Sequence, residues 1–124
     1  MNSQKILIVD DNADIRLGMH LRLKANHYQT FFAADAPSAV AEARKNQPDL
    51  IVLDPPRTGL GAETCALLAE IAAPAVACVS CDPATLGRDL RALIAAGYFI
   101  HSITLADLFP QTFHLETVVQ LRRS

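Results

Sequence analysis

The sequence predicts a single α/β domain over residues 1–124, a doubly wound three-layer sandwich with helices on both faces of a mostly parallel six-stranded sheet. Three observations support this. Short apolar runs alternate with segments of helical periodicity, which is typical of parallel strands joined by crossovers. At 124 residues, 51% of them hydrophobic, the chain suits one compact core. The last two strand-like runs have no helix between them, which indicates an antiparallel sixth strand.

The first half is expected to contain three strands and two helices. Its apolar runs are short and continuous, as in strands that are buried on both faces of a sheet. A capping side chain precedes the first helix, and a proline suits the first turn of the second. The strands are expected at residues 5–10, 28–33 and 49–54, and the helices after Asn12 and from Pro37 to about residue 46.

The second half continues this alternation before it ends in two strands. A loop rich in proline and glycine follows the third strand, Asp82-Pro83 begins a helix, and Gly97 ends it. The expected helices cover about residues 62–72 and 82–97, and the expected strands cover residues 75–80, 98–105 and 113–121.

The core is expected where the strands meet apolar helix stripes. Ile15, Met19 and Leu23 form one stripe at four-residue spacing, and a second stripe runs from Leu86 to Ile94. Burial of strand side chains against these stripes should stabilise the fold. The strand residues expected inside are Ile6, Ile8, Leu50, Val52, Val76, Val79, Ile103 and Val118.

Charge and hydropathy exclude several classes of protein. A formal net charge of −2 argues against a broad electrostatic contact with nucleic acid. No apolar run reaches the roughly 18 residues of a membrane span, and the first residues do not resemble a signal peptide. We therefore expect a cytoplasmic protein. All the lysines lie within the first 45 residues, so the composition changes near mid-chain.

Two of the three cysteines, Cys78 and Cys81, have the spacing of some redox and zinc sites. They fall on a strand-like run, however, where positions three apart face opposite sides of the sheet. Zinc would also need two more ligands than this region provides. Free thiols are the simpler expectation.

Asp10, Asp11 and Asp54 form the first candidate site. They follow the first and third strands, which should be neighbours, and functional groups of doubly wound sheets gather at the carboxyl ends of the strands. Carboxylates that converge repel one another unless a proton or a cation relieves them. Mg²⁺ prefers oxygen ligands, so these three residues are a candidate Mg²⁺ site.

Residues 6–12 and 48–54 closely resemble the receiver domains of bacterial response regulators, which have a flavodoxin-like fold. The resemblance implies that Asp54 is the phosphoacceptor and that Asp10 and Asp11 hold Mg²⁺. A receiver also needs a lysine at the end of its fifth strand, and the second half of this chain has no lysine. A complete phosphorelay site is therefore not expected.

Three ordered motifs in the rest of the chain resemble the C-terminal half of SAM-dependent RNA uracil-5 methyltransferases. They are residues 54–57, 79–86 and 109–119. The resemblance implies that Cys81 is the nucleophile that adds to C6 of uracil, so that C5 can take a methyl group from SAM. It also implies that Glu116 is the base that removes the C5 proton and that Asp54 lies near the target base.

Other parts of that family's machinery are not recognisable. A glycine-rich SAM loop should follow the first strand, but residues 10–14 contain no glycine and carry negative charge that would repel the SAM carboxylate. We also find no segment that resembles the family's RNA-binding N-terminal domain and expect that domain to be missing. The sequence therefore argues against SAM binding and against RNA binding, and no cofactor is expected to be required.

The two resemblances meet at Asp54, because both families end a central strand in aspartate. We interpret the chain as an engineered chimera, receiver-like over residues 1–54 and methyltransferase-like over residues 55–124, that is a structural scaffold and not an enzyme. Asp54, Cys81 and Glu116 would then be vestigial catalytic residues. Together the resemblances imply the strand order 2-1-3-4-6-5, with strand 6 antiparallel.

Two alternatives stay open. One is a receiver-like domain that binds Mg²⁺ and has weak phosphoacceptor ability at Asp54. The other is a remnant RNA uracil-5 methyltransferase that uses Cys81 and Glu116. No specific partner is expected, although exposed apolar surface would favour self-association.

Overall fold

The computed structural model describes residues 4–54, 59–80, 82–106 and 116–123. The helices and strands in these ranges agree with the expected segments to within a few residues. Only the expected start of the last strand, near residue 113, lies outside the described residues. The strands are β1 Lys5–Val9, β2 Gln29–Ala33, β3 Leu50–Leu53, β4 Ala75–Ser80, β5 Tyr98–Ala106 and β6 Glu116–Arg123, and the helices are α1 Ala13–Ala25, α2 Ala36–Asn46, α3 Gly61–Ile71 and α4 Pro83–Ala95.

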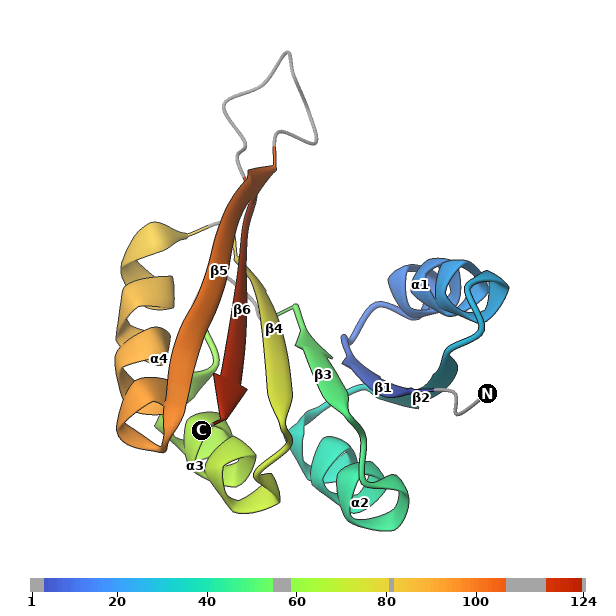
Figure 1. Ribbon diagram of the computed structural model, residues 1–124, viewed down its shortest axis with the longest axis horizontal. Coiled ribbons are helices and arrows are strands. Elements are labelled where there is room, and N and C mark those ends of the chain that lie inside the picture. The colour runs from blue at the N-terminus through green and yellow to red at the C-terminus, as the bar shows by residue number, and fades with distance from the viewer. Residues whose placement is uncertain (1–3, 55–58, 81, 107–115, 124) are drawn as a thin grey trace.

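All six strands belong to one sheet, in the order β2-β1-β3-β4-β6-β5 (Figure 1). β1 pairs in parallel with β2 and β3, and β3 pairs in parallel with β4. β6 is antiparallel to both of its neighbours, β4 and β5. The predicted fold class, strand order and antiparallel sixth strand are therefore confirmed. None of the helices within the described ranges has the length and apolar character to cross a bilayer.

Side-chain caps determine where three of the helices begin. Asn12 accepts hydrogen bonds from two backbone N–H groups in the first turn of α1, as its position in the sequence suggested. Asp35 and Ser38 form a capping box at the start of α2. Asp82 caps α4, and Gly97 follows that helix with a φ of 107°. Each of these caps follows a strand within a few residues, so the three helices begin at the carboxyl edge of the sheet.

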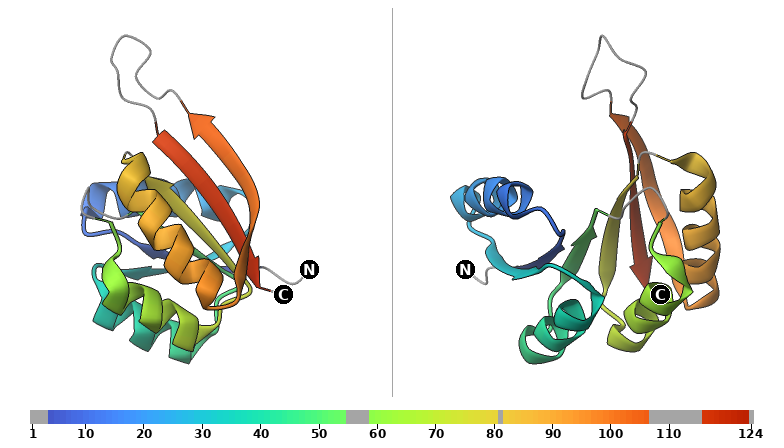
Figure 2. Two further views of the ribbon diagram at one scale, coloured as in Figure 1. Left: turned by 90° about the vertical axis from the view of Figure 1, so that its left-hand side faces the viewer. Right: turned by 180° about the vertical axis from the view of Figure 1, so that it is seen from behind.

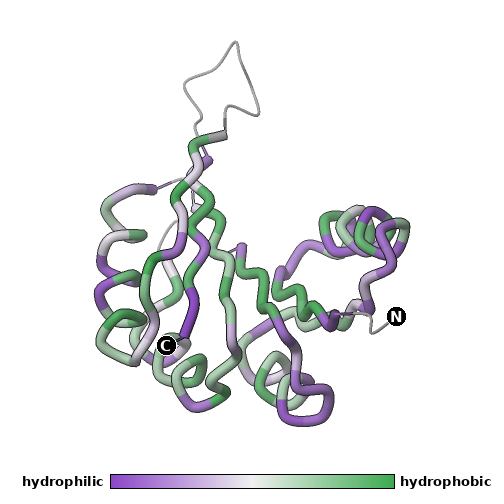
Figure 3. Tube along the Cα trace, viewed as in Figure 1, coloured by the Kyte–Doolittle hydropathy of each residue, from purple (hydrophilic) through white to green (hydrophobic). Residues whose placement is uncertain are grey.

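The two faces of the sheet are covered unequally. Figures 1 and 2 show α2, α3 and α4 on one face, here called the covered face, and α1 alone on the other, the α1 face. The main cluster of buried side chains draws on α2, α3 and α4, whereas no residue of α1 is buried. Along the chain, the apolar stretches gather in the central strands (Figure 3). The cluster is Leu7, Ala33, Ala39, Ala43, Ile51, Leu53, Cys65, Leu68, Ala73, Val76, Cys78, Leu86, Leu93, Tyr98, Val119 and Leu121.

The expected core is correct only where a helix covers the strands. Ile6, Ile8 and Val76 are buried as predicted. Leu50, Val52, Val79 and Val118 are only half-buried. The prediction for Ile103 is wrong, because its side chain is 58% exposed on the edge strand β5.

Register explains why burial fades across the α1 face. Ile8 pairs with Val52, Val52 with Ala77, and Ala77 with Gln120, so these four side chains form one row on one face. Ile8 and the small side chain of Ala77 are buried, Val52 is half-buried and Gln120 is exposed. The helix α1 packs on β2 and β1, so it covers the part of this row on β1 and leaves Gln120 on β6 uncovered.

Candidate functional site

The carboxyl ends of the parallel strands bring the predicted acids to one edge of the sheet. Val9 pairs with Leu53, so Asp10 and Asp54 follow directly at adjacent positions. The backbone N–H of Asp54 donates to the carbonyl of Val9 at 3.3 Å, and that of Asp10 donates to the carbonyl of Ala33 at 3.1 Å. This confirms the expectation that the first and third strands are neighbours.

Asp10 and Asp54 form a carboxyl pair. Asp10 is only 4% exposed, and its Oδ1 accepts the backbone N–H of Asn12 at 2.9 Å. No N–H or hydroxyl group of the described residues hydrogen-bonds its buried Oδ2. The Asp10 side chain raises the pKa of Asp54, both as a hydrogen-bonding neighbour and through its negative charge. Protonation of Asp54 relieves the repulsion between the two carboxyl groups, while Oδ2 of Asp10 keeps no hydrogen-bond partner among the described residues.

The environment of Asp54 favours its protonated form. Burial is the largest cause, followed by the hydrogen bond with Asp10 and by the negative charges of Asp10, Glu116 and Asp11, and together they raise the pKa of Asp54 to about 7. Such a carboxyl group exchanges its proton near neutral pH, as groups at catalytic sites often do.

The predicted Mg²⁺ ligands are brought together only in part. Asp10 and Asp54 are neighbours at the ends of their strands. The side chain of Asp11 is exposed, and its negative charge helps to raise the pKa of Asp54. Across the described ranges, no group of three His, Cys, Asp or Glu side chains is arranged to hold a metal ion. Mg²⁺ binding by Asp10, Asp11 and Asp54 stays a prediction.

Glu116 lies at the same edge as Asp54. It is the first residue of β6, and its neighbour Thr117 pairs with Ser80, the last residue of β4. The charge of Glu116 contributes to the raised pKa of Asp54. The predicted nucleophile Cys81 follows Ser80 in the chain but lies outside the described residues. The topology therefore gathers Asp54, Glu116 and the end of β4 at one edge.

The described cysteines are not poised for thiolate chemistry. Burial is the main cause that raises the pKa of Cys78 to about 12, and it also raises the pKa of Cys65. Both thiols are free and lie in the core cluster. At neutral pH both buried thiols therefore favour their protonated form.

A cavity of about 490 Å³ opens at the acidic edge. Asp10, Asp11, Asp35 and Asp54 line one part of it, and apolar side chains of β1, α1, α2 and α3 line the rest. This size and mixture are usual for a small-molecule site. The unpartnered Oδ2 of Asp10 and the surrounding acids suit a ligand with positive charge and hydroxyl donors.

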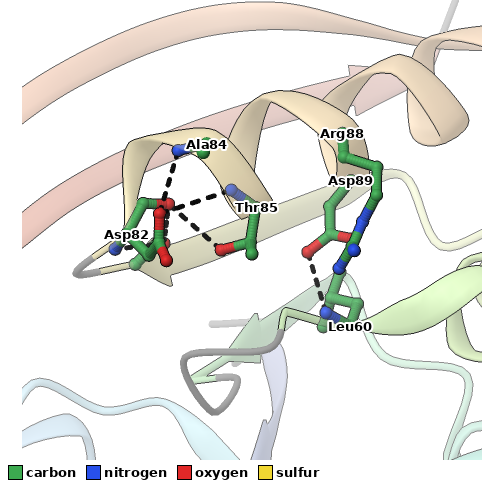
Figure 4. Close-up of polar contacts among 7 residues, drawn as sticks. Leu60, Asp82, Ala84, Thr85, Arg88 and Asp89 are labelled. Carbon is green, nitrogen blue, oxygen red and sulfur yellow. Dashed lines mark hydrogen bonds and ion pairs between the residues drawn. The ribbon is translucent and has the colours of Figure 1, made fainter.

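Two residues of this region escaped the sequence analysis. Asp35 follows β2 just as Asp10 follows β1, so the strand-end argument could have found it; hydrogen bonds from the Ser38 side chain and backbone lower its pKa. Asp89 is buried on α4, where it accepts the backbone N–H of Leu60 at 2.8 Å (Figure 4). In the sequence, the sign that could have revealed Asp89 was an acidic residue among the apolar residues of the helix stripe.

Comparison with known proteins identifies the larger part of the chain. Residues 41–124 match the family tRNA (Uracil-5-)-methyltransferase. An uncharacterized RNA methyltransferase of Clostridium tetani is 42% identical over 75% of this chain. The 23S rRNA (uracil(747)-C(5))-methyltransferase RlmC of Shewanella loihica is 39% identical over 75% of it. The aligned regions are 20% and 24% of those two relatives, so the chain spans about a fifth of their length.

Two solved structures from different protein families resemble this chain. The Pyrococcus abyssi tRNA (uracil-54, C5)-methyltransferase, in complex with S-adenosyl-L-homocysteine, has a TM-score of 0.63 at 21% identity, covering 98% of this chain and 34% of that one. At that identity the likeness concerns the fold. NtrX from Brucella abortus has a TM-score of 0.53 at 29% identity, covering 77% of this chain and 21% of that one.

These findings correct several expectations. The interpretation as an engineered scaffold that is not an enzyme is wrong, because the matched family and relatives are named for methyl transfer to RNA. The argument against SAM binding is contradicted by a neighbour of the same fold that was solved with S-adenosyl-L-homocysteine. The argument against RNA is weakened, since RlmC is named for 23S rRNA. With its match extending over residues 41–124, the chain belongs to the tRNA (Uracil-5-)-methyltransferase family.

Proposed function

We propose that this chain provides the uracil-reacting part of a SAM-dependent RNA uracil-5 methyltransferase. The observation that carries the proposal is the family match over residues 41–124, within which Asp54 and Glu116 lie at one edge of the sheet. Because the chain spans about a fifth of its curated relatives, the whole reaction is proposed for the protein to which this part belongs.

Each of the three motif residues has a role in this proposal. Cys81 directly precedes Asp82, the N-cap of α4, and a helix N-terminus favours the thiolate that adds to C6 of uracil. Glu116 accepts the C5 proton once the methyl group has been transferred, and the C6–S bond then breaks, which restores the C5–C6 double bond and releases the Cys81 thiolate. Asp54, with a pKa raised to about 7, can donate or accept a hydrogen bond at the polar edge of the target base.

The acidic cavity is the proposed SAM site. SAM supplies the methyl group, and its positive charge and ribose hydroxyls suit the carboxyl groups of Asp10, Asp11 and Asp35. The buried, unpartnered Oδ2 of Asp10 supports such a ligand. Apolar side chains on the opposite wall would exclude water from an aromatic base. The loop after β1 has no glycine, so its side chains rather than a bare backbone would make the contacts.

Methyl transfer and SAM binding test the proposal separately. The whole protein to which this chain belongs is incubated with methyl-labelled SAM and uracil-containing RNA, and label in the RNA is counted for the unsubstituted protein and for Cys81→Ala. Cys65→Ala, which removes a buried thiol outside the predicted site, is the matched control. We expect transfer that Cys81→Ala abolishes and Cys65→Ala preserves. Calorimetric titration with SAM should give a binding isotherm that Asp10→Asn weakens. Equal transfer by both cysteine variants would contradict the role of Cys81.

A second candidate function concerns the first half of the same domain. We propose that residues 1–54 form a receiver-like segment, fused at the end of β3 to a methyltransferase-like segment over residues 55–124. The likeness to NtrX covers 77% of the chain and so extends beyond the family match that begins at residue 41. The contact between Asp10 and Asp54 supports an acidic Mg²⁺ site with weak phosphoacceptor ability at Asp54.

An amide NMR titration with Mg²⁺, and then with fluoroberyllate as an acyl-phosphate mimic, tests this second candidate. We expect saturable shifts at Asp10, Asp11 and Asp54 that Asp54→Ala removes. A dispersed spectrum that ignores both additions would reject the receiver-like site without affecting the methyltransferase proposal.

A further inference from the structure

The further inference concerns Asp89, a buried acid on α4. It is 3% exposed and lies on the buried side of the helix together with Leu86 and Leu93. Its Oδ2 accepts the backbone N–H of Leu60 at 2.8 Å, and its Oδ1 lies 3.8 Å from Nε of Arg88, a side chain that is largely exposed. Burying a carboxylate is costly, and this one is buried where it contacts the backbone that leads into α3. Among the described residues, its shortest polar contact is the one with the N–H of Leu60.

Gly59 is shaped to accept this carboxylate. Its φ of +84° belongs to the left-handed region, and a Cβ added there would lie 2.6 Å from Oδ2 of Asp89 and 2.8 Å from Nη2 of Arg88. Only glycine therefore lets the backbone of residues 59 and 60 approach the acid so closely. The glycine and the buried carboxylate are complementary parts of one contact between α4 and the segment that enters α3.

This contact also forms one wall of the acidic cavity. Gly59 and Leu60 line the cavity that Asp10 and Asp54 line as well. Leu60 is the residue before α3, and its side chain makes no capping hydrogen bond to that helix. The carboxylate of Asp89, on α4, instead accepts the N–H of Leu60 at the start of α3 (Figure 4). The helix α4 begins two residues after Cys81 in the chain.

We propose that Asp89 is a positioning residue, whose carboxylate holds the Gly59–Leu60 wall of the acidic cavity against α4. Without the acceptor, the N–H of Leu60 has no partner at a partly buried position, and the wall moves outward to reach water. Water then enters beside Asp54 and the cavity loses its shape. That SAM is the ligand of this cavity rests on the proposed function. The hydrogen bond between Leu60 and Asp89 does not depend on that proposal.

The first test measures amide hydrogen exchange at Leu60 in three variants. Asp89→Leu removes the acceptor and should speed exchange at Leu60 roughly ten- to a hundredfold, whereas Asp89→Asn keeps a side-chain oxygen acceptor and should stay near the unsubstituted rate. Tyr98→Phe is the matched control, because it deletes another buried hydrogen bond, Tyr98 Oη to the Ala73 carbonyl at 2.8 Å. Equal acceleration by Tyr98→Phe would overturn the proposal, since the effect would then be general loss of stability.

The second readout reports on the cavity itself. Carbon-detected NMR titration of the Asp54 carboxyl should show an apparent pKa near 7 in the unsubstituted chain and in Tyr98→Phe. In Asp89→Leu we expect that pKa to fall toward the usual range, since burial is the largest cause of its elevation. An unchanged Asp54 pKa in Asp89→Leu, together with an unchanged Leu60 exchange rate, would refute the positioning role.

A double substitution tests the partnership with Gly59. Gly59→Ala should accelerate Leu60 exchange as Asp89→Leu does, because the new Cβ collides with the carboxylate. In the combined variant with Asp89→Ala the collision is relieved, so the joint effect should be smaller than the product of the separate effects. Strictly multiplicative effects would contradict a direct contact. Failure of the unsubstituted chain to bind SAM would count against the proposed function, while Leu60 exchange decides the role of Asp89.

Discussion

The two faces of the sheet show how differently similar helices can contribute to one fold. α4 buries Leu86 and Leu93 against the covered face, whereas α1, a helix of equal length, buries no side chain on the α1 face. Both helices contain many apolar residues and both begin with a polar N-cap. The difference teaches that apolar content does not by itself attach a helix to a sheet.

The spacing of the apolar side chains explains this difference. In α1 they recur at every second position from Ile15 to Leu23, so they spread around the helix axis instead of forming one stripe. The expected stripe of Ile15, Met19 and Leu23 exists, but Met19 and Leu23 are only half-buried and Ile15 is exposed. In α4 the spacings of three and four residues keep the apolar groups on one side.

The largest expected effect contrasts one leucine from each helix. Leu93→Ala on α4 removes a side chain with 0% exposure and should lower the free energy of unfolding by about 2–5 kcal/mol. Leu21→Ala on α1 removes one that is 59% exposed and should change it by no more than about 0.5 kcal/mol. Urea denaturation of both variants measures the two values. Similar losses would mean that the α1 face is packed as well as the covered face.

A second, smaller effect on stability concerns Asp54, at the carboxyl edge of the sheet. Its folded pKa of about 7 exceeds its usual value of 3.8, so the folded chain keeps a proton there that the unfolded chain releases between about pH 4 and 7. The contribution is complete below pH 4 and is lost as the pH rises to 7. Because Asp54 is partly exposed and water screens its neighbours, we expect a loss of roughly 1–2 kcal/mol.

Urea denaturation between pH 4.5 and pH 8 checks this pH dependence. Asp54→Asn has no proton to release, so the difference between its unfolding free energy and that of the unsubstituted chain should change with pH over this interval. Asp11→Asn, at an exposed neighbouring acid, is the control and should leave most of the pH dependence in place. A constant difference for Asp54→Asn would show that the carboxyl pair does not retain its proton in the folded chain.

The smallest expected effect on stability belongs to the exposed apolar side chains of β5. Ile103 is exposed on the edge strand, and an uncharged edge of this kind favours pairing with a second copy. Ile103→Lys should change the unfolding free energy by less than about 0.5 kcal/mol but reduce concentration-dependent association. Sedimentation velocity at several concentrations measures the association. Thr104→Lys places the same charge on the opposite face of β5. If it reduces association as much as Ile103→Lys does, the edge of the strand is responsible; if it does not, the face that carries Ile103 is responsible.

Much of the fold and part of the site follow from the sequence alone. Local patterns determine where each strand and helix lies, because apolar runs, caps and turn residues act over a few positions. The acids at the ends of the first and third strands meet as predicted, since parallel neighbours end at the same edge. The motifs around Asp54, Cys81 and Glu116 indicated the methyltransferase family, although the absence of a glycine loop led to the wrong conclusion about activity and SAM.

Tertiary structure alone decided which apolar faces are covered and which buried acids have partners. Periodicity tells which side chains share a face, but whether Ile103 is buried depends on a neighbouring layer that its own segment does not encode. Likewise, the hydrogen bond from Leu60 to Asp89 joins residues 29 positions apart through the packing of α3 beside α4. Contacts of this kind depend on distances in space rather than spacing along the chain, and for that reason only the folded structure determines them.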